Sequence, residues 1–81
     1  MTGPILFCRI DACRNMARFY MLSLEPTLFG EVAVLRHWGR MGTRGRQVST
    51  LHGTMAEAYR VLERQMARRL KRGYVAVAAV R

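Results

Sequence analysis

Acidic side chains are scarce in this sequence. Five Asp and Glu residues stand against fourteen Lys and Arg residues in 81, which gives a net charge of +9. The five carboxylates are scattered, whereas acid–base catalysis needs two of them, or a histidine with a partner, placed together. Ser23 and Ser49 also lack the sequence context of a hydrolase nucleophile. The sequence therefore predicts a protein that is not an enzyme.

Cysteine is rare as well, and long apolar runs are absent. Cys8 and Cys13 are too few for a disulfide scaffold, and with His37 and His52 they provide no pair at metal-ligand spacing. We therefore expect reduced cysteines, no metal and no cofactor. The apolar runs are short and broken by arginine, and the first residues do not resemble a signal peptide. These features predict a cytoplasmic protein with no membrane partner.

Arginine is abundant, at thirteen of the fourteen basic residues. A guanidinium group binds phosphate through two parallel hydrogen bonds and stacks on planar groups, whereas lysine acts as a hydrated point charge. The arginine excess therefore favours a polyanionic partner, nucleic acid before others. The alternative interpretation is that the charge only keeps a small protein soluble.

The sequence before Thr54 predicts mostly antiparallel strands. Residues 5–12 and 16–25 are rich in large apolar side chains and flank a turn-prone cluster at 11–15. A third strand is expected at 31–40 and, after a glycine-rich turn at 42–45, a fourth at 46–52. A short edge strand is expected at 74–77, with 78–81 frayed. Alternation places five side chains of the third strand on one face: Val32, Val34, Arg36, Trp38 and Arg40.

A long amphipathic helix is expected between Thr54 and Gly73. Thr54 is a good N-cap, Glu57 completes a capping box, and Gly73 provides the stop. Five residues at helical spacing form the predicted core face: Met55, Tyr59, Leu62, Met66 and Leu70. Four basic residues form a stripe on the opposite face, a second binding surface or a solubility feature: Arg60, Arg64, Arg68 and Lys71.

These elements predict one α+β domain over residues 1–81. Four or five antiparallel strands followed by one helix cannot form a parallel β-α-β sheet, so the helix should cover one face of the sheet. The other face is then open to solvent or to a partner.

The stretch from Trp38 to Gly45 combines the single tryptophan with fixed cations and three glycines at a strand end and turn. A flat aromatic ring beside guanidinium groups suits a sugar or base next to a phosphate. The candidate nucleic-acid-binding residues are Arg36, Trp38, Arg40, Arg44 and Arg46. In the alternative interpretation Trp38 is a core residue, Arg40 caps backbone carbonyls, and the other arginines form a solvated rim.

Several segments in order resemble the WGR domain, over about residues 11–74: Arg18-Phe19-Tyr20, Leu28-Phe29-Gly30, Trp38 to Gly42 with Gly45, a helix with Ala58, and Lys71-Arg72-Gly73-Tyr74. The resemblance is to the short stand-alone bacterial members. In poly(ADP-ribose) polymerases this domain contacts DNA near a strand break. The resemblance implies that Trp38 packs on a sugar or base at the end and that Arg40 takes the role of the motif arginine, which there bridges DNA and neighbouring domains.

The function expected from the sequence is thus binding of nucleic acid, DNA before RNA, through backbone and end contacts. The rival expectation is a protein-interaction or homodimerising module that uses the open sheet face. Its support is the 51% hydrophobic content, including Val32 and Val34 on the face of Trp38.

Overall fold

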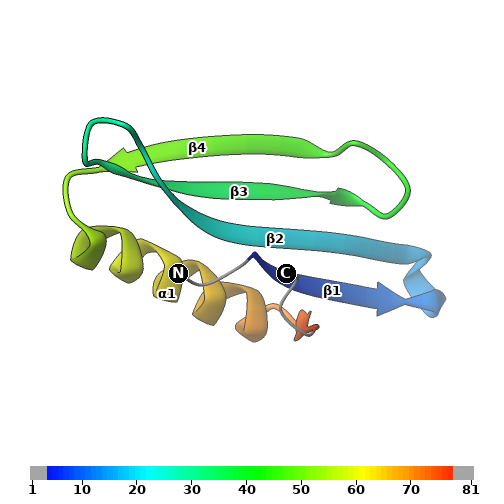
Figure 1. Ribbon diagram of the computed structural model, residues 1–81. Helices are drawn as coiled ribbons and strands as arrows, with labels where there is room; N and C mark the ends of the chain where they lie inside the picture. Colours follow the sequence, from blue (N-terminus) through cyan, green and yellow to red (C-terminus); the bar gives the residue numbers. More distant parts are fainter. Residues whose placement is uncertain (1–3, 78–81) are drawn as a thin grey trace.

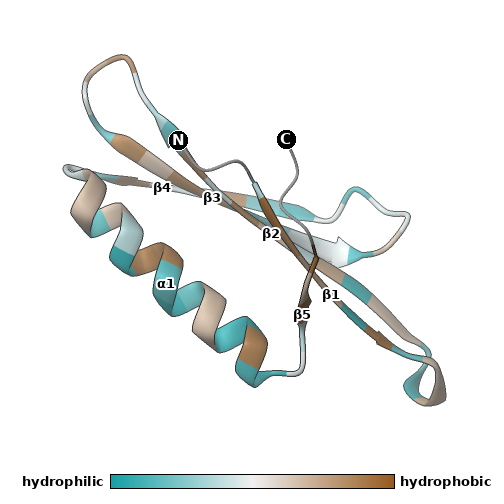
Figure 2. Cartoon of the chain, turned by 60° about the horizontal axis from the view of Figure 1, so that its bottom comes forward, coloured by the Kyte–Doolittle hydropathy of each residue, from teal (hydrophilic) through white to brown (hydrophobic). Residues whose placement is uncertain are grey.

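The computed structural model describes residues 4–77 as an antiparallel sheet with one long helix (Figure 1). The elements are β1 (Ile5–Asp11), a 3-10 turn (Ala12–Arg14), β2 (Met16–Pro26), β3 (Val32–Arg40), β4 (Arg46–His52), α1 (Met55–Lys71) and β5 (Val75–Ala76). The strands lie in the order β4-β3-β2-β1-β5. The α+β class is confirmed, and α1 lies on one side of the sheet (Figure 2).

The observed strand bounds agree with the sequence-based expectation to within a residue for β1 to β4. The fifth strand is shorter than expected, since only Val75–Ala76 pair with β1. The expected fraying at 78–81 lies outside the described residues. Within residues 4–77, no helix is both long enough and apolar enough to span a bilayer.

The strand register determines which side chains meet the helix, because directly opposed residues point to the same face of a sheet. Tyr20 of β2 lies opposite Phe7 of β1 and Trp38 of β3, and Leu24 lies opposite Val34. The buried cluster between this face and α1 is Phe7, Tyr20, Leu22, Leu24, Val32, Val34, Ala58, Leu62 and Tyr74.

The assignment of Val32 and Val34 to an open apolar face is therefore wrong. They do share a face with Trp38, but α1 covers that face, and their side chains are 5% and 1% exposed. The other face carries the alternate residues of each strand, and within residues 4–77 no helix packs on it.

The predicted core face of the helix is only partly correct. Leu62 is buried and Met66 packs against the core, but Met55, Tyr59 and Leu70 are 42%, 40% and 52% exposed. The contact face is rotated toward Ala58, which is fully buried and whose small side chain lets the helix approach the sheet.

Both helix caps follow the sequence signals. The Glu57 backbone N–H donates to the Thr54 hydroxyl at 3.2 Å. At the other end Gly73 has a φ of +89°, its N–H donates to the Leu70 carbonyl at 3.1 Å, and the Tyr74 N–H donates to the Arg69 carbonyl at 3.0 Å. This Schellman arrangement turns the chain back to the sheet and buries Tyr74 beside β1.

Candidate nucleic-acid interface

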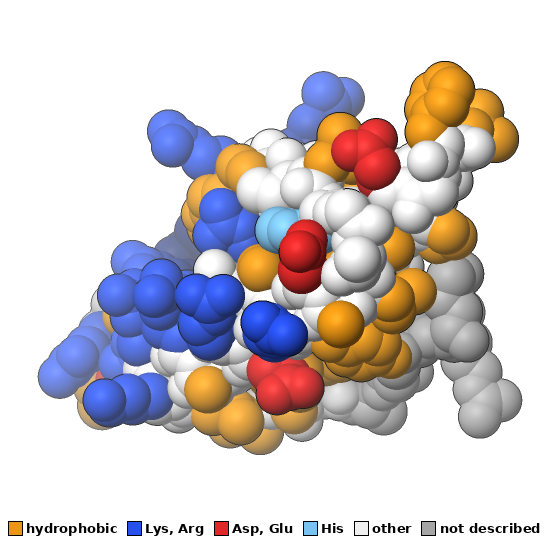
Figure 3. Space-filling model, turned by 90° about the vertical axis from the view of Figure 1, so that its left-hand side faces the viewer, with side chains coloured by type: hydrophobic (Ala, Val, Ile, Leu, Met, Phe, Trp, Pro, Cys, Tyr) orange, Lys and Arg blue, Asp and Glu red, His pale blue; other side chains and the backbone are white. Residues whose placement is uncertain are grey.

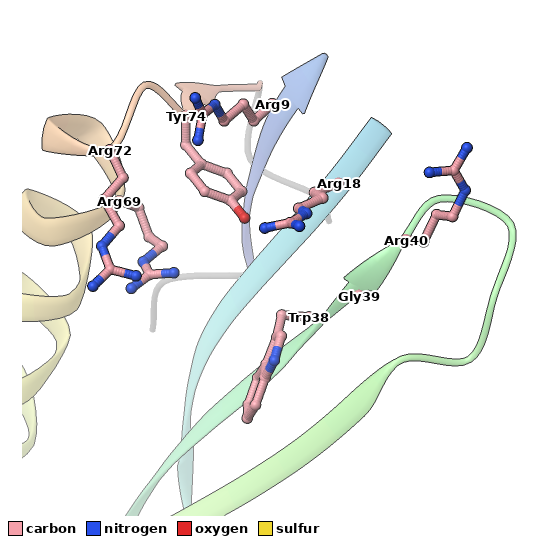
Figure 4. A pocket seen from close by; sticks show the side chains of 8 residues that line it. All are labelled: Arg9, Arg18, Trp38, Gly39, Arg40, Arg69, Arg72 and Tyr74. Carbon is pink, nitrogen blue, oxygen red and sulfur yellow. The ribbon is translucent and has the colours of Figure 1, made fainter. Parts of the chain in front are cut away.

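A cleft of about 440 Å³ opens where the C-terminal end of α1 meets the sheet (Figure 4). It is lined by Arg9, Arg18, Trp38, Gly39, Arg40, Arg69, Arg72 and Tyr74. The helix is shorter than the sheet: the 17 residues of α1 extend about 26 Å, whereas the 11 residues of β2 extend about 36 Å. The end of the sheet therefore projects beyond the helix, and the cleft forms at this step.

Three arginines lie in a row across the projecting end of the sheet. Arg18 of β2 is directly opposite Arg9 of β1 on one side and Arg40 of β3 on the other. Like charges at directly opposed positions repel one another, so this row costs stability. The next row on the same face contains Tyr20 and Trp38, which places aromatic rings beside the cations.

The end of the helix adds two more guanidinium groups to the cleft. The Arg69 guanidinium carbon lies 4.4 Å from the centroid of the Tyr20 ring and 5.6 Å from that of Tyr74. Its Nε is buried without a hydrogen-bond partner. Arg69 is thus fixed over the rings while part of its hydrogen-bonding capacity stays unused, and Arg72 lies beside it (Figure 4).

Within residues 4–77 no carboxylate neutralises the cleft arginines, because the one ion pair there joins Arg14 to Asp11 at 3.7 Å, in the β1–β2 turn. Four guanidinium groups, those of Arg9, Arg18, Arg69 and Arg72, therefore share one concave surface without a counter-charge from these residues, and Arg40 lies at its edge. This arrangement concentrates positive potential.

Trp38 is half-buried, and its packing supports the core role considered for it. Its ring stacks on Tyr20 at a centroid distance of 6.0 Å and an interplanar angle of 24°, and it packs against the core. The Arg36 guanidinium lies 5.5 Å above the Trp38 ring. Trp38 also lines the cleft.

Arg40 caps a backbone carbonyl, which is one of the two roles foreseen for it. Its Nη1 donates to the Asn15 carbonyl at 3.1 Å, and its Nη2 lies 3.5 Å from the Asn15 side-chain oxygen. Asn15 has a left-handed conformation with a φ of 51° at the β1–β2 turn. Arg40 thus ties the end of β3 to this turn, and in Figure 4 it points away from the other four arginines.

The glycine of the Trp38-Gly39-Arg40 motif is required by packing. A Cβ at Gly39 would lie 2.6 Å from the Gly45 Cα, and a Cβ at Gly45 would collide with the Trp38 carbonyl. Gly45 also has a φ of +69°, which favours glycine. The two glycines let the chain close tightly over Phe19 and so fix the positions of Trp38 and Arg40.

The other predicted binding residues surround the cleft without lining it. Arg46 is paired with Trp38 across β3 and β4 and shares its face, whereas Arg44 lies exposed in the β3–β4 turn. All four residues of the predicted helix stripe are exposed: Arg60, Arg64, Arg68 and Lys71. Of these, Arg60 and Arg64 line a separate depression with Glu63 and Ala67.

The sequence reasoning did not single out Arg9, Arg18, Arg69, Arg72 or Tyr74 as site residues. The turn at 11–15 contained a usable signal, because a hairpin centred on residues 13 and 14 places residue 9 opposite residue 18. The sequence contains no such signal for Arg69, because its position in the cleft depends on how α1 is rotated about its own axis.

The cysteines show no metal-binding arrangement. Cys8 and Cys13 are free, and among residues 4–77 no three His, Cys, Asp or Glu side chains lie close enough together to hold a metal ion.

Comparison with known proteins places the chain in a family. The model of the WGR domain matches residues 3–80. An uncharacterized protein of Sinorhizobium fredii, y4dW, is 44% identical over 66 residues, which cover 82% of this chain and 32% of that protein. A crystal structure of a Bacteroides fragilis protein shares the fold, with a TM-score of 0.78 and 20% identity over 91% of this chain and 19% of that chain. The chain thus spans about a third and a fifth of the lengths of these two relatives. It belongs to the WGR domain family.

Proposed function

We propose that this protein binds nucleic acid, DNA before RNA, through phosphate contacts in the arginine-lined cleft and without catalysis. WGR domains are associated with nucleic-acid binding. The observation that carries the proposal is the convergence of four guanidinium groups beside Trp38 and Tyr74, those of Arg9, Arg18, Arg69 and Arg72, none paired with a carboxylate of residues 4–77.

The chemistry of the cleft favours backbone recognition. Arg9 and Arg18 present forked donors that match phosphate oxygens, and the repulsion within their row falls when an anion binds between them. The free surface of Trp38 offers a stacking platform for a sugar or base. Because α1 closes one side of the cleft, a strand end or a single strand fits it better than the groove of a continuous duplex.

A matched pair of double variants tests the location of the site. Arg9→Gln with Arg18→Gln and Arg60→Gln with Arg64→Gln each remove two positive charges, the first from the cleft and the second from the outer face of α1. We expect the cleft variant to lose at least about tenfold in affinity, or about 1.4 kcal/mol, and the helix variant less than about threefold. Fluorescence anisotropy with a labelled oligonucleotide at fixed salt measures both.

Circular dichroism should show that both variants are folded, with an unchanged or higher thermal midpoint in the cleft variant because two opposed cations are removed. A larger affinity loss in the helix variant would make the outer face of α1 the interface. A panel of blunt, nicked, overhanging and single-stranded DNA with matched RNA then tests the preference for DNA ends. Equal or tighter binding of RNA would contradict the preference for DNA.

A further inference from the structure

The sheet separates its charges by face. All five arginines in strands lie on the face that meets α1: Arg9, Arg18, Arg36, Arg40 and Arg46. The other face, called here the uncovered face, consists of the alternate strand residues. Glu25 is its one Asp, Glu, Lys or Arg among the described strand positions. For a chain with a net charge of +9, this face has almost no formal charge.

The uncovered face is apolar over most of its strand positions, and its polar strand residues are Ser23, Glu25, His37, Gln47 and Ser49. Its side chains include Leu6, Ile10, Phe19, Met21, Leu35 and Leu51, with Cys8 among them. The helix packs on the opposite side of the sheet (Figure 2). In Figure 3 most Lys and Arg side chains gather on the left, and hydrophobic side chains predominate on the right.

We propose that the uncovered face is the interface of a homodimer in which two copies of this chain stack back to back. Two strongly basic chains approach most readily through a surface poor in cations. The described strand positions of this face carry no Lys or Arg, and Arg44 lies at its edge in the β3–β4 turn. A symmetric dimer places the same patch against itself, which suits an apolar, uncharged sheet. Two such sheets pack about 10 Å apart with their strands within about 30° of each other.

The size of the face predicts a weak but specific dimer. Strands β1 to β4 have at least seven residues each. At about 3.3 Å per residue and about 4.8 Å between strands, they cover roughly 450 Å² per copy. The pair would bury roughly 900 Å² or more, close to the lower limit of about 1,000 Å² for specific interfaces. We therefore expect a dissociation constant of about 1–100 µM.

Back-to-back stacking leaves both clefts on the outside, facing in opposite directions. If the proposed function holds, one dimer binds two nucleic-acid segments at once. This consequence depends on the proposed function, whereas the dimer itself does not.

Sedimentation without nucleic acid tests the dimer directly. Met21→Arg and Leu35→Arg are made separately. Each places the new arginine opposite, or close to, the same arginine of the other copy, and each should raise the dissociation constant at least about tenfold. Leu28→Arg is the matched control. Leu28 is equally apolar and 98% exposed, but it lies in the β2–β3 loop, outside the strand positions that form the uncovered face. Its substitution should leave association unchanged.

A wild-type chain that stays monomeric up to about 500 µM would overturn the proposal. So would loss of the dimer in Leu28→Arg while Met21→Arg and Leu35→Arg still associate, because the loop tip would then be the contact. Circular dichroism of each variant confirms that the comparison is between folded proteins.

The two cysteines provide a test on the unmodified chain. Cys8 is partly exposed on the uncovered face, whereas Cys13 is exposed in the turn at the end of the sheet. With rising protein concentration, alkylation of Cys8 by iodoacetamide should slow and that of Cys13 should not. Equal rates at Cys8 across the dimerisation range would contradict the proposal.

Salt separates failure of the dimer from failure of the proposed function. Screening reduces the repulsion between two basic chains, so added salt should strengthen dimerisation or leave it unchanged, while it weakens nucleic-acid binding. A dimer that dissociates as salt rises would mean that charged contacts hold it together, which the uncovered face does not offer.

Discussion

Trp38 shows at the scale of one residue why a small domain rarely separates structure from function. Its ring packs on Tyr20 and also lines the cleft beside the arginine row. The core role and the binding role considered for it from the sequence do not exclude each other, because a half-buried ring is compatible with both.

Replacement of Trp38 by alanine should therefore reduce both stability and affinity. We expect a loss of about 2 kcal/mol in the free energy of unfolding, less than for a fully buried tryptophan, because part of the ring is already in solvent. For the fraction that stays folded we expect a loss of about 1–3 kcal/mol in binding, if the ring stacks on a sugar or base. Urea denaturation and anisotropy titration at low temperature measure the two separately. Unchanged affinity in folded protein would make Trp38 a purely structural residue.

At the scale of elements, the hairpin between β3 and β4 depends on two glycines of different character. Gly45 combines a φ of +69° with a site in which a Cβ would strike the Trp38 carbonyl. Gly42 has a φ of +86° but open space around it. Substitutions at the two positions can therefore separate the cost of a left-handed backbone from the cost of a steric collision.

Gly42→Ala should cost about 1 kcal/mol of unfolding free energy, from the left-handed backbone alone. Gly45→Ala should cost at least about 2 kcal/mol more, because the Trp38 carbonyl must move as well. Chemical denaturation of both variants gives the difference. Equal costs would show that the hairpin relaxes around Gly45 and that the close approach does not constrain the motif.

The elements themselves were largely predictable from sequence, since each strand, both caps of α1 and the strand face shared by Trp38 and Arg40 follow from local patterns. The rotation of α1 was not predictable, because Tyr59 and Leu70 fit a helical apolar stripe as well as the residues that are buried. What decides it is tertiary: Ala58 permits close approach, and Tyr20 accepts the Arg69 guanidinium over its ring. The cleft was missed for the same reason, because two of its five arginines, Arg69 and Arg72, depend on how the helix end docks.

At the scale of the whole molecule, the cleft gathers five arginines, which sets the expected response of binding to ionic strength. If four or five phosphates are neutralised, the logarithm of the association constant should fall with the logarithm of salt concentration at a slope of about −3 to −5. Anisotropy titrations of one short duplex over a series of salt concentrations give this slope. A slope near zero would contradict phosphate binding and leave the uncovered face as the surface of interest.

The strand order has a consequence for synthesis. Strands β1 to β3 are each paired with the next strand in the chain, whereas β5 pairs with β1 across most of the sequence. On the ribosome, where chains emerge at about 5–20 residues per second, the Arg9–Arg18–Arg40 row can assemble before the residues around Arg69 and Tyr74 are available. A nascent chain therefore exposes the repelling cations before the helix end lies beside them. If the proposed function holds, affinity for nucleic acid is acquired only when the helix end and β5 pack beside the first strand.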